Sequence, residues 1–176
     1  MKTGDATLRP MSEQDLPTVL EWRNHPEIRR YMFTQHEIGA AEHRQWFERA
    51  ARDPGRRLMI FELDSRPQGY VGFELVNAGR VADWGFYLRP TAPRGIGSRL
   101  GAAALAYAFE EERFHKLCGR ALEYNGKSIR FHLSLGFVQE GLLTEQHFDG
   151  RDFHSVACFG LLARHWRAGG GPTYEQ

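Results

Sequence analysis

The sequence predicts an α/β fold of the α+β type, in which one mixed, mostly antiparallel sheet carries helices on both faces. Two observations predict it. Between residues 57 and 88 the apolar residues follow a period of two, and two turn sequences divide this stretch into three strands. A long Ala-rich helical stretch then links the third of these strands to a further one. Meandering strands followed by such a β-α-β unit give one mixed sheet with both faces covered.

The individual elements follow from local signals. Ser12 and Asp15 have the spacing of a capping box, Gly136 suits the left-handed end of a helix, and Asp149-Gly150 favours a hairpin turn. In chain order we expect strand 6–10, helix 12–23, one helical turn within 24–33, helix 39–52, strands 57–63, 69–76 and 81–88, helix 97–115, strand 116–123, helix 128–135, and strands 137–148 and 151–162. No linker or repeat divides them, so we predict one domain over residues 1–168 and a disordered tail over 169–176.

The composition argues against several functional classes. Lys and Arg number 23 against 22 Asp and Glu, a net charge of +1 that is too small for a general nucleic-acid binder. No apolar run reaches the roughly 18 residues of a membrane span, and the first residues do not resemble a signal peptide, so we expect no membrane partner and a cytoplasmic location. The His and Cys residues show no metal-ligand spacing, so we expect no metal.

The stretch "LRPTAPRGIGSRLG" (88–101) lies between a strand and a helix. It lacks the third glycine of a dinucleotide turn and the Gly-Lys-Ser/Thr of a Walker A loop. Gly95 and Gly97 nevertheless leave backbone N–H groups uncovered at the start of a long helix, where an anion is favoured. Arg89, Arg94 and Arg99 bracket the same turn. The stretch therefore predicts a phosphate site, with a plain turn and solvated arginines as the alternative.

Two motifs together resemble the GNAT superfamily of acetyl-CoA-dependent N-acetyltransferases. Residues 92–97, "APRGIG", resemble its Q/R-x-x-G-x-G/A pyrophosphate loop, and "LEYNGKSIRFHLSLGF" (122–137) resembles its N-x-x-S-x-x-Φ-Y-x-x-x-GF segment. The likeness covers about residues 6–166 and implies the GNAT fold, acetyl-CoA as cosubstrate and an amine as acceptor. Ala92 departs from the family's Gln or Arg, and we expect Arg94 or Arg89 to compensate.

The resemblance also implies how acetyl-CoA is held. The backbone of residues 86–88 would line the pantetheine arm, the glycine turn would bind the pyrophosphate, and Asn125 would contact the pantetheine amides. A simple N-cap is the alternative for Asn125, and Ser128 has the same ambiguity. The expected set is Phe86, Tyr87, Leu88, Arg89, Arg94, Gly95, Ile96, Gly97, Ser98, Arg99, Asn125 and Ser128.

Acetyl transfer to an amine needs a base and a proton donor for the leaving thiolate. The family places a tyrosine four residues before the glycine of Gly-Phe, and here that residue is His132. An imidazole with a pKa near ~6.5 can carry the proton, although a structural hydrogen bond is the alternative. Tyr124 and Tyr87 are the next candidates for the donor. Glu123 and Asp83 are the candidate bases, directly or through water, with a solvated carboxylate as the alternative.

The oxyanion that forms during acetyl transfer also needs hydrogen-bond donors. In the family these are backbone N–H groups where the central strand leaves its neighbour, after a β-bulge. Gly85 suits such a bulge, and we expect one there.

The N-terminal string "VLEWRNHPEIRRYMF" (19–33) and the late "FGLLARHW" (159–166) resemble a group within the superfamily that acetylates a UDP-linked 4-amino sugar in pseudaminic acid biosynthesis, for flagellin or surface glycans. The resemblance therefore implies a UDP-amino sugar as the small-molecule partner. Aromatic rings would stack the uracil and arginines would hold the diphosphate, with core packing as the alternative for the two tryptophans. These candidates are Trp22, Arg23, Arg30, Tyr31 and Trp46.

Two other functions remain open at this point. One is N-terminal alanine acetylation of ribosomal proteins, whose enzymes share the Leu-Arg-Pro opening, and the other is a CoA-binding module without turnover. The late strands would also allow a homodimer.

Overall fold

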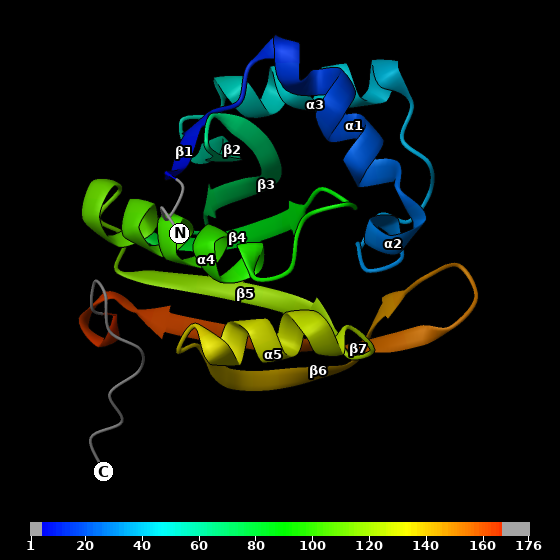
Figure 1. The fold of residues 1–176 in the computed structure, drawn as a ribbon. Helices are drawn as coiled ribbons and strands as arrows, with labels where there is room; N and C mark the ends of the chain where they lie inside the picture. The colour runs from blue at the N-terminus through cyan, green and yellow to red at the C-terminus, as the bar shows by residue number, and fades with distance from the viewer. Residues whose placement is uncertain (1–4, 167–176) are drawn as a thin grey trace.

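The structure, a computed structural model, describes residues 5–166 and contains one sheet of seven strands in the order β1-β2-β3-β4-β5-β7-β6 (Figure 1). The strands are β1 Ala6–Pro10, β2 Arg56–Leu63, β3 Arg66–Leu75, β4 Val81–Leu88, β5 Lys116–Leu122, β6 Val138–Phe148 and β7 Phe153–Leu162. The helices are α1 Leu16–Asn24, α2 Pro26–Arg29, α3 Ala40–Arg52, α4 Ile96–Ala106 and α5 Gly126–Ser134. The predicted tail, residues 169–176, lies outside the described residues.

The sheet is mixed and mostly antiparallel, as predicted. Only β4 and β5 run parallel among the described strands, and they pair over three residues, from Val81 opposite Lys116 to Asp83 opposite Cys118. Both strands continue beyond this point, β4 to Leu88 and β5 to Leu122, without pairing to each other. The two central strands therefore diverge toward their carboxyl ends and open a gap in the middle of the sheet.

Helices cover both faces of the sheet, which confirms the predicted layers. Met59 and Phe61 of β2 pack in one apolar cluster with residues of α4 and α5, whereas the intervening Ile60 packs with residues of α1 and α3. This alternation is the period of two that the sequence shows in the strand. Burying side chains of this size contributes about 1.5–3 kcal/mol each, so both helix layers are fixed onto the sheet by apolar contact.

Most of the predicted turn and cap signals are present. The Ser12 backbone N–H donates to the Asp15 carboxylate at 2.8 Å in a capping box. Gly136 ends α5 with φ +88°, and Gly150 turns the β6–β7 hairpin with φ +101°. These two backbone conformations favour glycine because a Cβ would be strained there.

Several boundaries differ from the prediction, most clearly those of β3, α4 and α5. The turn before β3 is only Asp64-Ser65, both with positive φ, so β3 begins at Arg66 rather than at residue 69. The helix predicted to reach residue 115 starts at Ile96, leaves the α-helical pattern after Ala106 and ends in a π-helical turn, Tyr107–Glu111. The helix predicted from residue 128 begins at Gly126.

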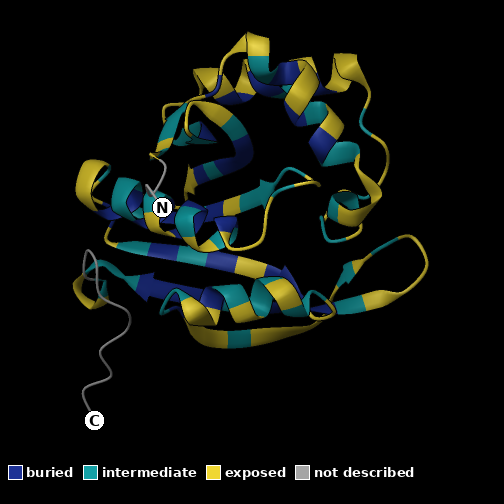
Figure 2. Cartoon of the chain, viewed as in Figure 1, coloured by how far each residue is buried: buried dark blue, intermediate teal, exposed yellow. Residues whose placement is uncertain are grey.

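Strand β6 forms one edge of the sheet and is exposed along most of its length (Figure 2). Val138, Leu142, Leu143 and Phe148 are exposed on this strand, and Phe153 is exposed on β7. Exposed apolar residues on an unpaired edge strand are compatible with a homodimer, which stays a prediction.

The helices within residues 5–166 are all too short or too polar to span a membrane.

Candidate active site

Two clefts meet where β4 and β5 diverge. The first, of about 370 Å³, is lined by residues of β2, β3, β4 and β5. The second, of about 440 Å³, is lined by the end of β4, the turn after it, the start of α4 and α5. Five residues line both clefts and mark their junction: Tyr31, Met32, Phe86, Asn125 and Ser128. Two ligands could therefore enter from opposite sides and meet at this junction. We call the two spaces the first cleft and the second cleft.

The turn after β4 has the features expected of an anion site. Gly95 is left-handed with φ +85°, and the space where a Cβ would lie is open. The turn delivers the first N–H groups of the eleven-residue helix α4 outward, where the helix dipole favours negative charge. Arg94 is exposed, and no hydrogen bond or ion pair of its side chain is found within residues 5–166. The predicted phosphate turn therefore has a free cation beside free backbone donors.

The other predicted residues of this region fall into two groups. Phe86, Tyr87, Leu88, Arg89 and Gly97 line the second cleft, and so does Ala92. Arg94, Gly95, Ile96, Ser98 and Arg99 do not line it, and the side chain of Ile96 is buried in the core.

Arg89 is held in place by its neighbours rather than left free. Its Nε donates to the Gln68 side chain at 2.7 Å and one terminal nitrogen donates to Thr91 Oγ1 at 3.1 Å. Arg89 therefore stiffens the turn, and Arg94 is the better placed of the two to compensate for Ala92.

Backbone donors at the opening come from β4 without a bulge. The β3–β4 register runs unbroken from Gly69 opposite Leu88 to Leu75 opposite Ala82, so the bulge expected at Gly85 is absent. The divergence of β4 from β5 also leaves backbone donors unpaired. Beyond Asp83, alternate N–H groups of β4 have no strand partner on the side that faces β5. Gly85 is exposed and has open space where a Cβ would lie, which keeps this edge accessible.

His132 lines the first cleft but is almost completely buried. Its ring is 2% exposed and stacks on Phe159 with ring centroids 4.7 Å apart. Trp84 Nε1–H donates to Nε2 at 3.1 Å, and Nδ1 contacts the Ser128 carbonyl at 2.8 Å, which makes Nδ1 the protonated nitrogen. Burial lowers the pKa of His132. An imidazole that is neutral, with both nitrogens engaged, fits the structural alternative and argues against a proton donor.

The two candidate bases are placed differently. Asp83 lines the first cleft at the last position of β4 that pairs with β5, and its carboxylate accepts a hydrogen bond from Arg120 at 2.7 Å. The Glu123 carboxylate accepts from the Ser155 backbone N–H at 2.8 Å and lines neither cleft. Asp83 is therefore the carboxylate at the opening. Asn125 and Ser128 line both clefts, and Asn125 also caps α5 by accepting from the Ser128 N–H.

Of the residues expected to hold the acceptor, two reach the first cleft and three do not. Tyr31 and Trp46 line it, and Trp46 also packs against Tyr70. Trp22 is 7% exposed and belongs to the core, as its helical spacing allowed. The last two are used elsewhere: Arg23 donates to the Thr34 carbonyl at 2.8 Å, and Arg30 pairs with Glu27 at 3.5 Å.

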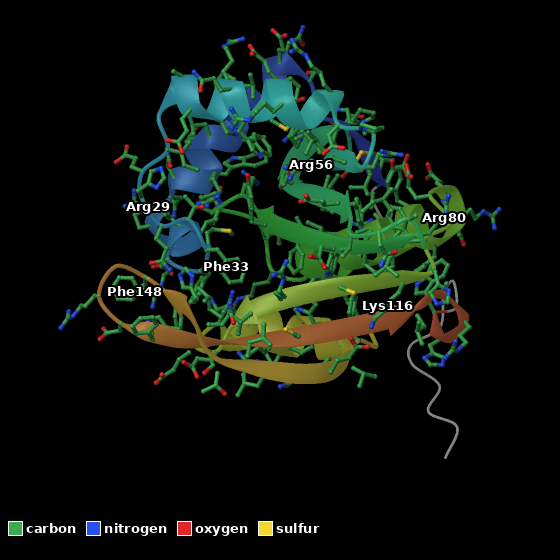
Figure 3. The ribbon with its side chains drawn as sticks, turned by 180° about the vertical axis from the view of Figure 1, so that it is seen from behind. Arg29, Phe33, Arg56, Arg80, Lys116 and Phe148 are labelled. Atoms are coloured by element: carbon green, nitrogen blue, oxygen red, sulfur yellow. The ribbon has the colours of Figure 1, made fainter. Side chains whose placement is uncertain are left out.

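The first cleft contains charged residues that the sequence did not single out. Arg56 and Glu74 stand opposite each other on β2 and β3 and form an ion pair at 2.7 Å, and Arg120 pairs with Asp83 (Figure 3 labels Arg56). The Arg56–Glu74 pair could have been found from the hairpin register, but Arg120 faces the cleft only because β4 and β5 diverge. The side chains described offer no cluster of three His, Cys, Asp or Glu residues able to hold a metal ion.

Comparison with known proteins decides the family. Residues 5–138 match the family model described as the acetyltransferase (GNAT) domain. The chain belongs to the GNAT acetyltransferase family. This confirms the resemblance seen in the two motifs, and it makes the chain an N-acetyltransferase by family.

The relatives of this GNAT chain are distant and carry different names. It is 24% identical over 122 residues to acetyltransferase PseH of Campylobacter jejuni, covering 69% of this chain and 76% of the relative. It is 27% identical over 143 residues to spermidine N(1)-acetyltransferase of Escherichia coli K12, covering 80% and 77%. The structure of spermidine N-acetyltransferase from Vibrio cholerae in complex with CoA and spermine has a TM-score of 0.83 at 24% identity, over 90% of this chain and 96% of that one, which confirms the predicted fold.

Proposed function

We propose that this GNAT enzyme transfers an acetyl group from acetyl-CoA to the primary amine of a small molecule, and that the acceptor is a UDP-linked 4-amino sugar. The observation that carries the proposal is the meeting of two unlike clefts at the opening between β4 and β5. The second cleft reaches Ala92 and Gly97 of the glycine turn, which also carries Arg94 and the start of α4, and the first cleft contains balanced charges and aromatic rings.

The second cleft fits acetyl-CoA. Arg94 and the N–H groups at the start of α4 would hold the pyrophosphate, and the backbone of Phe86, Tyr87 and Leu88 would line the pantetheine arm, with Asn125 and Ser128 opposite. Acetyl-CoA supplies an acetyl group activated as a thioester. The unpaired edge of β4 supplies hydrogen-bond donors where the two clefts meet, in a position to stabilise negative charge that develops on the acetyl oxygen.

Asp83 is our candidate for the group that receives the amine. An ammonium has no lone pair for attack, so a carboxylate at the mouth of the first cleft can bind it and accept its proton, directly or through water. The Arg120 guanidinium already donates to the Asp83 carboxylate at 2.7 Å, so an incoming ammonium would share that carboxylate with Arg120.

The charge balance of the first cleft favours a UDP-amino sugar over a polyamine. Its charged lining residues are Arg56, Glu74, Asp83 and Arg120, whose formal charges cancel. A polyamine carries only positive charges and gains from an acidic site, whereas a UDP-amino sugar brings an amine and a diphosphate together. Arg56 Nε is buried and makes no hydrogen bond among the described residues, although the Asp53 carboxylate lies 3.5 Å from it. Tyr31 and Trp46 on the same cleft offer faces for a base.

The test is thiol release from acetyl-CoA with three acceptors: a UDP-4-amino sugar, spermidine and a ribosomal N-terminal peptide. We expect kcat/KM for the sugar to exceed the others by at least tenfold. Preferred turnover of spermidine or the peptide would refute the sugar acceptor and leave acetyl transfer standing. A thermal-shift titration with CoA covers the remaining alternative, since a ligand at ~100 times its Kd adds ~2.7 kcal/mol of stability. A clear shift without turnover of any acceptor would instead favour a CoA-binding module.

The Asp83 assignment has its own test. Asp83→Asn should lower kcat/KM for the acceptor by at least tenfold while the Kd of CoA stays within twofold. Glu123→Gln is the matched control, because that carboxylate lines neither cleft. Equal effects of both substitutions would contradict the assignment.

A further inference from the structure

The segment between α2 and α3, residues 30–39, forms part of the wall where the clefts meet. Tyr31 and Met32 line both clefts, and Phe33 lines the first. The segment has no helix or strand, so its position depends on side-chain contacts made across the cleft. Residues 30–36, which we call the strap, contain all of the cleft-lining positions of the segment. The contacts that fix the strap therefore determine the shape of the first cleft, where we propose that the acceptor binds.

On one side the strap is fixed to α1 by direct hydrogen bonds. Arg23 donates to the Thr34 carbonyl at 2.8 Å. Just beyond the strap, the Asn24 side chain both donates to the Ile38 carbonyl and accepts from the Ile38 N–H, each at 2.8 Å. These hydrogen bonds join the segment to α1 and make no connection to β5 or α5.

On the other side a single phenol holds both ends of the strap. Tyr124 O–H donates to the Arg30 carbonyl at 3.0 Å, and Gln35 Nε2 donates to the Tyr124 oxygen at 2.9 Å. Gln35 Nε2 also reaches the Arg30 carbonyl at 3.3 Å, which closes a ring of three hydrogen bonds. Tyr124 directly precedes Asn125, the cap of α5 that lines both clefts. The phenol thus ties the strap to the element that carries the junction.

Aromatic contacts follow the same path. The Tyr31 and Tyr124 rings lie 6.1 Å apart, and the Phe33 ring meets the edge of His147 on β6 at 5.4 Å. Figure 3 shows Phe33 between the α2 region and the β6–β7 hairpin, which Phe148 marks. Tyr124 is 39% exposed and Phe33 is 47% exposed, so these contacts can open without breaking the core.

We propose that Tyr124 is a positioning residue that latches the strap over the junction and so sets the affinity for the acceptor. Tyr124 lines neither cleft, and its hydroxyl is committed to the strap, so it acts through the position of Tyr31 and Phe33. The expected change in KM rests on the proposed acetyl transfer to a small amine. The contacts that hold the strap, and the hydrogen exchange that reports on them, do not depend on that proposal.

The test compares Tyr124→Phe and Gln35→Ala with the native enzyme. Tyr124→Phe removes the bridging hydroxyl and keeps the ring, and Gln35→Ala removes the second arm of the latch. We expect each variant to raise KM for the acceptor about tenfold, which corresponds to ~1.4 kcal/mol and to the loss of one or two hydrogen bonds. We expect kcat and the Kd of CoA to change less than twofold, because the other walls of the second cleft lie on β4, α4 and α5. Tyr107→Phe, which loses a hydroxyl bonded to Glu112 at 2.8 Å, is the matched control.

Amide hydrogen exchange without any acceptor gives the second readout. The amides of residues 30–36 should exchange about tenfold faster in both variants and unchanged in Tyr107→Phe. If Tyr124 were the proton donor to the thiolate, Tyr124→Phe would lower kcat, Gln35→Ala would behave as native, and exchange would not change. That pattern, or unchanged exchange in both variants, overturns the latch. If no amine acceptor is acetylated, the proposed function is overturned. The hydrogen-exchange result then tests on its own whether Tyr124 holds the strap in place.

Discussion

Acid should destabilise this protein through its buried histidines well before its carboxylates titrate. Burial lowers the pKa of His132, and burial together with the nearby Arg23 lowers the pKa of His43. A histidine with a depressed folded pKa binds fewer protons folded than unfolded. Its contribution to stability is therefore complete above the unfolded value near ~6.5 and is lost as the pH falls through the window between that value and the lower folded one.

The magnitude follows from the linkage relation. Each such histidine gives a limiting slope of ~1.4 kcal/mol per pH unit below ~6.5, so the loss between pH 7.5 and 5.5 is at most about 1.4 kcal/mol per histidine. For a chain of this length that upper limit lowers Tm by about 3–6 °C. Asp15, whose pKa is lowered to about 2 mainly by its hydrogen bond from Arg9, has the same sign but acts only below its usual value, so this window isolates the histidines.

The assay is urea unfolding followed by tryptophan fluorescence at pH 7.5, 6.5 and 5.5, for the native protein, His132→Phe and the control His115→Phe, whose side chain is exposed. At pH 7.5 His132→Phe should be less stable by about 1–3 kcal/mol, because the buried Trp84 N–H loses its acceptor. Toward pH 5.5 the difference in unfolding free energy between native and His132→Phe should narrow, by at most about 1.4 kcal/mol. A native protein whose stability is flat over this range, or a variant with the native slope, would refute the reasoning.

Three further predictions concern single positions. Gly119→Ala should destabilise the fold by about 1–3 kcal/mol in urea unfolding, because its Cβ would overlap the His132 and Trp84 rings, and an unchanged midpoint would contradict this. Gly95→Ala forces alanine into a left-handed turn and should weaken CoA binding in calorimetry at a cost of about 1 kcal/mol, with Gly126→Ala as the control. Asp15→Asn should lose about 1–2 kcal/mol at neutral pH and progressively less as the pH falls toward 2, so an equal loss at neutral pH and near pH 2 would argue against the Arg9 pair.

The fold could be predicted from the sequence because its signals are local. The period of two in β2 to β4, the capping box at Ser12 and the glycines at 136 and 150 each act within a few residues, and the structure contains them all. The order of these elements then limits the topology to one mixed sheet. Errors fell on boundaries such as the end of α4, where a π-helical turn is set by packing against neighbours rather than by propensity.

The candidate site was predictable only where it is built from one stretch of chain. The glycine turn and the residues of β4 that line the second cleft follow each other in sequence, so a local pattern points to them together. The first cleft is assembled from β2, β3, β4 and β5, so Arg56 and Arg120 come together only through the divergence of two strands. No spacing in the sequence carries that information.

His132 shows how the surroundings of a motif position can change the chemistry of the residue placed there. The motif places a phenol four residues before Gly136, but the imidazole found there is shorter, and Gly119 beneath it has no side chain, so the ring sits in the core. Its Nε2 then needs a buried donor, which Trp84 supplies, and the same hydrogen bond keeps that nitrogen unprotonated. The three residues depend on one another, because a side chain at 119 would displace the ring and a phenylalanine at 84 would leave Nε2 unpaired. Of the two carboxylates considered as bases, Asp83 is the one that lines the first cleft and stands where β4 and β5 separate.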